Sequence, residues 1–431
     1  MIAQGAERAA HHHRIGVEHL PNALRGLAPP EQAHMHQHMQ HSGKPAIGLH
    51  RIPFRNNSCY AILTDPHMCN IYCYTIKELR CTALGYPIWR GTALPPLFRH
   101  PEKSPMKETI LQTRTIKMSL LEAGHGPLVV LCHGFPETKR AWRHQIAALA
   151  QAGYRAVAPD LRGYGQSEAP EGAEHYSVIH AVGDLVALLD ALGEQQAVIV
   201  GHDWGATIAW QAALMRPDRF RAVVALSVPM MGQPPVPPSR IFPQNENALF
   251  YTLYFQNPEG AEAEFGRDPR QTLRKLIFAA SGEAGPRLPG DATPNPFGMV
   301  SRSSGLLATL PDPARLPDWL PGAEFDALAQ AFEASGFTGG LNYYRNLDRN
   351  WELQQAYAGA TVTPPALFLI GTRDSGLAMP GMDQIIAAMP ALVPDLRGSH
   401  LVEGAGHWLQ QERPAEVSAL ILDFLRQLPD R

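Results

Sequence analysis

The sequence predicts an α/β fold with a mostly parallel sheet, helices on both faces of the sheet and an inserted helical cap. Between residues 106 and 228, short apolar segments typical of buried strands alternate with segments of helical periodicity. The alternation stops between residues 229 and 346, where prolines and aromatic residues are frequent, and it resumes between residues 347 and 431. The chain is therefore divided into a first core segment, a cap and a second core segment, preceded by an extension of residues 1–105.

The individual elements follow from apolar runs and their periodicity. The first core segment is expected to contain strands at 110–121, 128–132, 155–159, 197–201 and 222–227, and helices at 141–152, 182–192 and 206–215. The second core segment is expected to contain strands at 365–370 and 400–403 and a terminal helix at 415–428. An inserted cap would cover the carboxyl ends of the strands, where α/β proteins bind their ligands.

The composition is that of a globular enzyme. The chain has 431 residues, of which 45% are hydrophobic and 18% charged, so it can bury a large core. A formal net charge of -3 gives no reason to expect a nucleic-acid partner or an anionic membrane surface. No segment approaches the roughly 20 apolar residues of a membrane helix, and no secretory signal is recognisable. We therefore expect a cytoplasmic protein, and the oligomeric state stays open.

Residues 1–105 differ from the rest of the chain. They contain most of the 19 histidines, including His11-His12-His13 and the run from His34 to His41, and they lack a sustained strand or helix period. Four of the five cysteines lie here, at spacings that match no paired Cys-x-x-Cys pattern: Cys59, Cys69, Cys73 and Cys81. We expect a disordered extension, or a start codon assigned too far upstream with Met106 as the true beginning. A metal-binding arm is the alternative.

The segment Val198–Gly205, which reads Val-Ile-Val-Gly-His-Asp-Trp-Gly, carries the most informative motif. An apolar strand leads into a glycine-bounded turn and then into a helix, which is the context of the nucleophile elbow of α/β-hydrolases. Asp203 stands where an esterase carries serine. A carboxylate at this position attacks saturated carbon and leaves an alkyl-enzyme ester, as in ring opening or halide displacement.

Two further residues follow predicted strands in the order nucleophile, acid and histidine that this fold uses. Asp374 ends the run Gly371-Thr-Arg-Asp, and His407 lies in the loop Gly404-Ala-Gly-His-Trp. Taken singly, an Asp after a strand is usually a turn former and a loop histidine is usually only solvated. Together with Asp203 they predict a catalytic triad, in which His407 activates water and Asp374 orients the imidazole.

The loop His133-Gly-Phe-Pro-Glu follows the predicted strand 128–132 and is expected to supply part of an oxyanion hole. Hydrolysis of an ester at Asp203 passes through a tetrahedral oxyanion, which needs N–H donors. In this fold one donor comes from this loop and the other from the residue after the nucleophile. The roles therefore fall to the backbone N–H groups of Phe135 and Trp204. A plain strand-to-helix turn is the weaker interpretation, because His-Gly-x-Pro is unusually specific when it precedes such an elbow.

With these residues in place, the chain from about Met106 onwards resembles the epoxide hydrolases of the α/β-hydrolase fold. The oxyanion and nucleophile motifs carry the resemblance, together with Gly406-His-Trp and the downstream Glu412-Arg-Pro. The resemblance implies hydrolysis of a small apolar epoxide by water to a vicinal diol, without a cofactor or a metal. Residues 1–105 have no counterpart in the minimal enzyme, and they do not resemble the phosphatase domain of the vertebrate enzymes.

The cap gives the most discriminating part of this resemblance. The segments Phe250-Tyr-Thr-Leu-Tyr-Phe-Gln and Leu341-Asn-Tyr-Tyr-Arg-Asn-Leu are similar to the two cap segments that bear the ring-opening tyrosines of the family. The resemblance implies that Tyr251 and Tyr344 donate hydrogen bonds to the epoxide oxygen. A phenol, with a pKa of about 10, can donate to this oxygen without prior ionisation. The neighbouring tyrosines are expected to pack in the cap.

Three alternatives remain open. A haloalkane dehalogenase shares the Asp nucleophile, the histidine and a tryptophan after the nucleophile, but a halide leaving group calls for indole or amide donors rather than paired phenols. A fluoroacetate dehalogenase is disfavoured because its nucleophile is typically followed by arginine, whereas Trp204 follows Asp203 here. A non-catalytic binding protein of the same fold is disfavoured by the complete set of nucleophile, acid, histidine and oxyanion loop.

Overall fold

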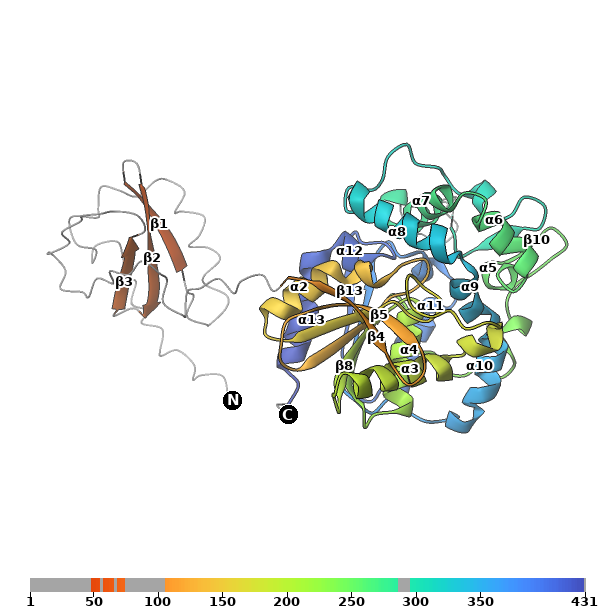
Figure 1. Ribbon diagram of the computed structural model, residues 1–431, viewed down its shortest axis with the longest axis horizontal. Coiled ribbons are helices and arrows are strands. Elements are labelled where there is room, and N and C mark those ends of the chain that lie inside the picture. Colours follow the sequence, from red (N-terminus) through yellow and green to blue (C-terminus); the bar gives the residue numbers. More distant parts are fainter. Residues whose placement is uncertain (1–47, 55–56, 66–67, 74–104, 286–294, 430–431) are drawn as a thin grey trace, which may run out of the picture. The chain divides into compact units, whose positions relative to one another are not determined.

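The computed structural model describes residues 48–54, 57–65, 68–73, 105–285 and 295–429. The chain divides into two units, Met1–Arg99 and His100–Arg431 (Figure 1). In the first unit, three strands form an antiparallel sheet in the order β1-β2-β3: β1 (Gly48–Phe54), β2 (Asn57–Asp65) and β3 (Met68–Cys73).

These three strands lie in a segment for which the sequence pattern predicts no regular structure. They are rich in residues that favour strands, such as Tyr60, Ile62 and Ile71, but their apolar residues do not alternate regularly, so a search for periodicity misses them. The histidine runs at 11–13 and 34–41 lie outside the described residues. The alternative of a metal-binding arm, which depends on these histidines, therefore also falls outside the described residues.

The His100–Arg431 unit is built on an eight-stranded sheet in the order β13-β12-β9-β8-β6-β7-β5-β4. Its strands are β4 (Lys107–Gln112), β5 (Lys117–Ala123), β6 (Leu128–Cys132), β7 (Arg155–Pro159), β8 (Ala197–His202), β9 (Phe220–Leu226), β12 (Ala366–Gly371) and β13 (Leu396–Val402). All neighbours from β7 to β13 pair in parallel, whereas β5 is antiparallel to both β7 and β4. The predicted mostly parallel sheet is confirmed.

Helices cover both faces of this sheet. On one face, α2 (Arg143–Gln151) and α13 (Pro414–Arg426) pack on side chains such as Val129 and Val198. On the other face, α3 (Val178–Ala191) and α4 (Trp204–Met215) pack on the strand residues next to these in the sequence, such as Val130 and Ile199. Because successive strand residues point to opposite faces, both sets are buried, which explains why the strands are continuous apolar runs.

Several predicted boundaries are wrong. The single strand expected at 110–121 is two antiparallel strands, β4 and β5, joined by a turn in which Thr113 Oγ1 accepts from the Ile116 N–H. The helix expected from residue 182 begins at Val178, after the N-cap Ser177. The strand expected at 400–403 is β13, which begins at Leu396. The helix α11 (Met382–Leu392) is missed, since Pro390 interrupts its sequence pattern.

The chain between β9 and β12 contains most of the remaining helices. We call residues 229–346 the cap segment. It contains the helices α5 (Tyr251–Tyr254), α6 (Ala263–Phe265), α7 (Pro269–Ala280), α8 (Gly322–Ser335) and α9 (Thr338–Arg345), and the short antiparallel pair β10 (Ala248–Phe250) and β11 (Met299–Ser301). Figure 1 shows α6, α7 and α8 gathered on one side of the unit, above the sheet and next to α12 (Leu409–Glu412). The helix α10 (Leu347–Leu353) leads back toward β12.

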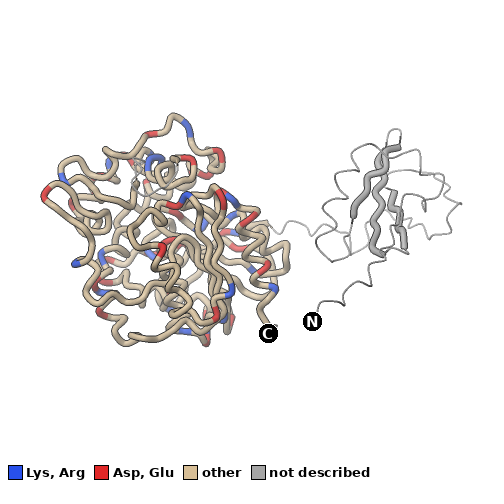
Figure 2. Tube along the Cα trace, turned by 180° about the vertical axis from the view of Figure 1, so that it is seen from behind, with Lys and Arg blue, Asp and Glu red and all other residues tan. Residues whose placement is uncertain are grey.

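The surface of the His100–Arg431 unit carries charges of both signs. In Figure 2, Lys and Arg are interspersed with Asp and Glu along the trace, without a large region of one sign. Within the described ranges, no helix combines the length and the apolar character that crossing a membrane requires.

Candidate active site

Asp203 sits at the point where β8 ends and α4 begins. Its backbone has a φ of 55° and a ψ of -120°, a region that residues other than glycine rarely adopt. The turn is tight, because a Cβ on Gly205 would lie 2.0 Å from the Cys132 carbonyl oxygen. The strained turn holds the Asp203 side chain above the sheet with only 8% of the residue exposed, in the manner of a nucleophile elbow.

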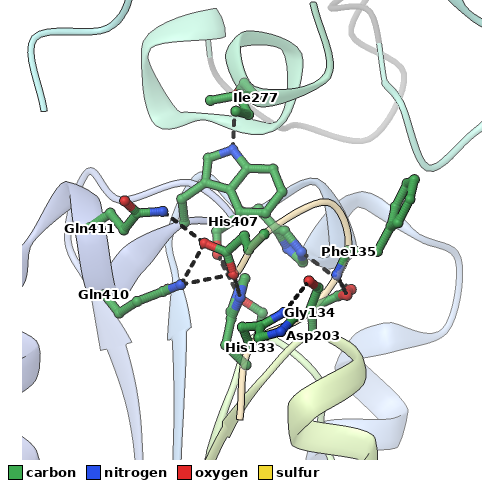
Figure 3. A network of polar contacts seen from close by, with 12 residues as sticks. His133, Gly134, Phe135, Asp203, Ile277, His407, Gln410 and Gln411 are labelled. Carbon is green, nitrogen blue, oxygen red and sulfur yellow. Dashed lines mark hydrogen bonds and ion pairs between the residues drawn. The ribbon is translucent and has the colours of Figure 1, made fainter. Parts of the chain in front are cut away.

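The loop after β6 contacts one oxygen of this carboxylate. The Phe135 N–H donates to Asp203 Oδ1 at 2.8 Å, as Figure 3 shows. Trp204 is the first residue of α4, so its N–H is one of the helix N-terminal donors. Among the hydrogen bonds of the described residues, none joins the Trp204 N–H to Asp203. Of the two predicted oxyanion donors, the structure thus brings Phe135 onto the carboxylate in the resting state.

The other oxygen faces His407. Asp203 Oδ2 lies 3.5 Å from His407 Nε2, and His407 Nδ1 lies 3.1 Å from Asp374 Oδ2. A carboxylate only accepts hydrogen bonds, so Nδ1 donates to Asp374, which leaves Nε2 directed at the nucleophile. The Gly376 N–H also donates to Asp374 at 2.8 Å, and Asp374 is fully buried. The three predicted triad residues therefore come together at the ends of β8, β12 and β13.

The charges of the triad shift one another's pKa values. Burial alone would lower the pKa of His407, but the negative charges of Asp374 and Asp203 outweigh it and raise the pKa to about 10. Burial opposes ionisation of Asp203 and Asp374 as well, yet His407 holds the pKa of each carboxyl below its ordinary value. At neutral pH the resting site is therefore an imidazolium between two carboxylates.

This ion pairing should make stability depend on pH. The folded pKa of His407 is raised above its ordinary value of 6.5, so its contribution is fully present below pH 6.5 and is lost as the pH rises to about 10. We expect the difference in unfolding free energy between the wild type and His407→Gln to shrink across this window. Urea unfolding from pH 6 to pH 10 measures it, and a difference that stays constant or grows would contradict the assignment.

Two aromatic rings from the cap segment complete the site. The rings of Tyr251 and Tyr344 lie 6.0 Å apart, and Tyr344 packs edge-on against Trp204 at 5.1 Å. Burial raises the pKa of both phenols, and the negative charge of Asp203 raises each of them further. Both tyrosines are therefore protonated donors close enough to Asp203 to sense its charge. The ring of Phe297 packs against the rings of both Tyr251 and His407, with centroid distances of 5.5 and 4.8 Å respectively.

The adjacent pocket is apolar. Most of its lining side chains are aromatic or aliphatic: Phe135, Pro136, Phe255, Leu276, Pro296, Phe297, Tyr344 and Trp408. Such a lining with few polar groups is typical of sites for small apolar ligands.

The neighbouring tyrosines point elsewhere. The Tyr254 hydroxyl donates to Glu264 Oε2 at 2.8 Å within the cap segment. The Tyr343 hydroxyl donates to the Arg162 carbonyl at 3.2 Å, and its ring is fully buried. The hydroxyls of these two tyrosines are occupied by hydrogen bonds within the protein. Of the four cap tyrosines, Tyr251 and Tyr344 are therefore the pair available to a ligand.

Sequence reasoning missed a buried polar network under His407. The ring of His202 lies between two acceptors, with Nε2 2.8 Å from the His407 carbonyl oxygen and Nδ1 2.7 Å from Glu137 Oε2. The side-chain amides of Gln410 and Gln411 donate to the same Glu137 carboxylate (Figure 3). His202 belongs to the nucleophile motif and Glu137 to the oxyanion-loop motif. An ionisable residue inside each motif was therefore the sequence signal from which this network could have been predicted.

No cofactor or metal is implied by these residues. Within the described part of the chain, no group of three or more His, Cys, Asp or Glu is arranged to hold a metal ion. The site instead combines a carboxylate, an imidazole with its own carboxylate, one backbone donor and two phenols. This set can perform nucleophilic attack, stabilise a leaving oxygen and deprotonate water.

Comparison with known proteins places this geometry in a family. Residues 127–274 match the α/β-hydrolase fold family model. Epoxide hydrolase A of Mycobacterium tuberculosis is 45% identical over 325 residues, which span 74% of this chain and 98% of the relative. The chain belongs to the epoxide hydrolase family.

Solved structures of the family agree with the fold. The crystal structure of epoxide hydrolase A from Mycobacterium thermoresistibile is 43% identical, with a TM-score of 0.69 and coverage of 76% of this chain and 100% of that chain. Potato epoxide hydrolase I is 38% identical, with a TM-score of 0.66 and coverage of 75% and 100%. The predicted α/β-hydrolase fold is therefore confirmed, and the family likeness predicted from the motifs is correct.

Proposed function

We propose that this protein hydrolyses small apolar epoxides to vicinal diols through an alkyl ester on Asp203. The observation that carries the proposal is the placement of Asp203 between the His407–Asp374 pair and two cap tyrosines that sense its charge. A serine-type hydrolase would need a hydroxyl at this position, and a simple binding pocket would gain nothing from a strained, buried carboxylate.

In the first step, Asp203 Oδ2 attacks a ring carbon and the carbon–oxygen bond of the epoxide breaks. The departing oxygen takes a proton from Tyr251 or Tyr344 while the other phenol donates a hydrogen bond. Both phenols are held in the protonated form, since burial raises their pKa values. The His407 imidazolium supplies the proton that restores the ionised phenol, so the step ends with a neutral ester and a neutral imidazole.

In the second step, neutral His407 takes a proton from water, and the water oxygen attacks the Asp203 carbonyl carbon. Esterification has removed the negative charge of Asp203, one of the two charges that raise the pKa of His407. The imidazole can therefore stay neutral long enough to act as a base. The Phe135 N–H, which already contacts Oδ1, stabilises the oxyanion. Collapse breaks the bond between the Asp203 carbonyl carbon and the alcohol oxygen, which leaves with the proton of the newly added hydroxyl. The diol is thereby released, and the Asp203 carboxylate and the His407 imidazolium are restored.

The cap tyrosines give a prediction for the first step. Tyr251→Phe and Tyr344→Phe should each slow alkylation of Asp203 roughly a hundredfold, because losing one donor to a developing oxyanion costs about 3 kcal/mol. Stopped-flow tryptophan fluorescence can follow this step, since Trp204 adjoins the nucleophile. Tyr254→Phe is the matched control, because its hydroxyl bonds to Glu264 rather than facing the site. Equal effects of all three substitutions would contradict the assignment.

The rival function is dehalogenation with the same nucleophile. A halide has to be held by N–H donors, whereas the two cap-segment side chains whose pKa values the charge of Asp203 raises are phenols. The deciding experiment offers the purified enzyme styrene-oxide-like, fatty and small aliphatic epoxides beside chloroalkanes of matching length. We expect diol from at least one class of epoxide and no halide release. Halide release without diol formation would overturn the proposal.

A further inference from the structure

Another buried acidic side chain, Glu412, lies beside the triad without belonging to it. Glu412 is 6% exposed, and three backbone N–H groups donate to its side chain. Gly282 and Gly406 donate to Oε2 at 2.9 and 3.0 Å, and Trp408 donates to Oε1 at 3.1 Å. Among the ion pairs of the described residues none involves Glu412. Burial raises the pKa of its carboxyl above the ordinary value, and the three N–H donors offset this only in part.

Two of these donors flank the catalytic histidine. Gly406 and Trp408 are the residues immediately before and after His407, so the Glu412 carboxylate spans the peptide units on both sides of the imidazole. The direction of the His407 side chain follows from the orientation of these peptide units. Moving them would change the 3.5 Å distance between Nε2 and Asp203 Oδ2.

The third donor belongs to the cap segment. Gly282 follows the C-terminal end of α7, and the same end makes two further contacts with the histidine loop. The His407 N–H donates to the Ala280 carbonyl at 2.9 Å, and the Trp408 indole donates to the Ile277 carbonyl at 2.8 Å (Figure 3). These carbonyls have no partner within α7, because a helix leaves its last four carbonyl groups free.

The acid loop joins the same cluster. Arg373, the residue before Asp374, donates to the Gly282 carbonyl at 3.0 Å. The histidine loop also approaches the end of α7 closely, since a Cβ on Gly406 would lie 2.2 Å from the Gly282 nitrogen. The end of α7 is therefore a fixed point to which both the acid loop and the histidine loop are bonded.

We propose that Glu412 is a positioning residue for ester hydrolysis, which holds His407 against the end of α7 so that its Nε2 faces the esterified Asp203. This inference rests on the proposed function, because it assumes the ester and the base role of His407. Glu412 touches neither the substrate nor the reacting atoms. The attack of Asp203 on the epoxide depends on the nucleophile and the cap tyrosines, so Glu412 should matter less for that step than for the second.

The test uses Glu412→Gln in the full chain under single-turnover conditions. Glutamine keeps the shape but replaces one acceptor oxygen by a donor, so at least one of the three N–H groups loses its partner. We expect alkylation within about twofold of the wild type and ester hydrolysis slowed about tenfold or more, because small misplacements of a catalytic group cost this much. The ester should then accumulate on Asp203, visible by mass spectrometry of the quenched enzyme.

Matched variants separate positioning from general destabilisation. Asp348→Asn is the control, since Asp348 also accepts a backbone bond, from the Ser239 N–H at 2.9 Å, but lies on α10 away from the triad. Its two rates should stay equal to those of the wild type. If Glu412→Gln folds poorly, Glu412→Asp keeps the charge with a shorter reach and should show a smaller effect of the same kind.

The outcomes distinguish the two proposals. Wild-type enzyme that never carries an ester on Asp203 would overturn the proposed function. Wild-type enzyme that forms the ester, combined with a Glu412→Gln variant in which both rates fall equally or neither falls, would overturn the positioning role alone.

Discussion

Asp203→Ala should abolish epoxide hydrolysis, lowering kcat/KM by roughly 10⁴-fold or more, the scale on which enzymes lose activity when a nucleophile is removed. No other described carboxylate can replace it. Asp374 is fully buried and bonded to His407 Nδ1 and the Gly376 N–H, and Glu137 lies under His202. The measurement is the rate of diol formation from the best epoxide of the panel.

Two controls make this result interpretable. Asp218→Ala removes an exposed carboxylate that follows the C-terminal end of α4 and pairs with Arg216, and should leave the rate unchanged. Circular dichroism and urea unfolding establish that the Asp203 variant is folded. A folded Asp203→Ala enzyme that keeps more than about a hundredth of the wild-type rate would mean that water attacks the epoxide directly, with Asp203 in a supporting role.

His407→Gln should still allow ring opening, because the imidazolium only restores the phenol proton after the carbon–oxygen bond has broken, and it should nearly stop the second step. Ring opening needs the Asp203 carboxylate and the cap phenols, whereas hydrolysis of the ester needs a base at Nε2, whose loss costs about 10²- to 10⁴-fold. We expect one equivalent of epoxide to be consumed per enzyme, followed by very slow turnover. Mass spectrometry should find Asp203 carrying the mass of the substrate.

The control for this variant is His400→Gln. His400 is an exposed histidine on β13, the strand that leads to His407, and it contacts no member of the triad. Its substitution should change neither step. If His407→Gln lost the first step as completely as the second, the histidine would be required for ring opening, and the division of labour between Asp203 and His407 would be wrong.

The core of the fold could be predicted because buried parallel strands appear in the sequence as short continuous apolar runs. The predicted strands 128–132 and 155–159 coincide with β6 and β7, since both faces of these strands are buried and every residue except Arg155 is apolar or small. The turn between β4 and β5 was not predictable in this way. It contains neither glycine nor proline and is closed by the Thr113 side chain.

Only those site residues that directly follow a predicted strand could be predicted from the sequence pattern. Asp203, Asp374 and His407 each follow a strand, so parallel pairing alone brings them to one edge of the sheet. The partners that orient them come from remote positions. Glu137 reaches His202 across 65 residues, and Glu412 reaches the end of α7 across 130 residues, and no local pattern in the sequence records either contact.

The choice among the cap tyrosines shows a further limit. Tyr251 and Tyr254 lie on one short helix and Tyr343 and Tyr344 are adjacent, so periodicity could not separate them, and family resemblance was needed. In the structure, the two pairs of tyrosines differ in the partners of their hydroxyls and in the charges that act on them. Tyr254 and Tyr343 donate to Glu264 and to the Arg162 carbonyl, whereas the charge of Asp203 acts on the other two phenols.

The most direct test of the alkyl-enzyme mechanism is a single turnover in oxygen-18 water with enzyme in excess over epoxide. If Asp203 attacks the ring, its own Oδ2 leaves in the diol and a solvent oxygen replaces it. The account predicts an unlabelled diol and one heavy oxygen in the peptide that contains Asp203. A labelled diol from the first turnover, with an unlabelled Asp203, would contradict it.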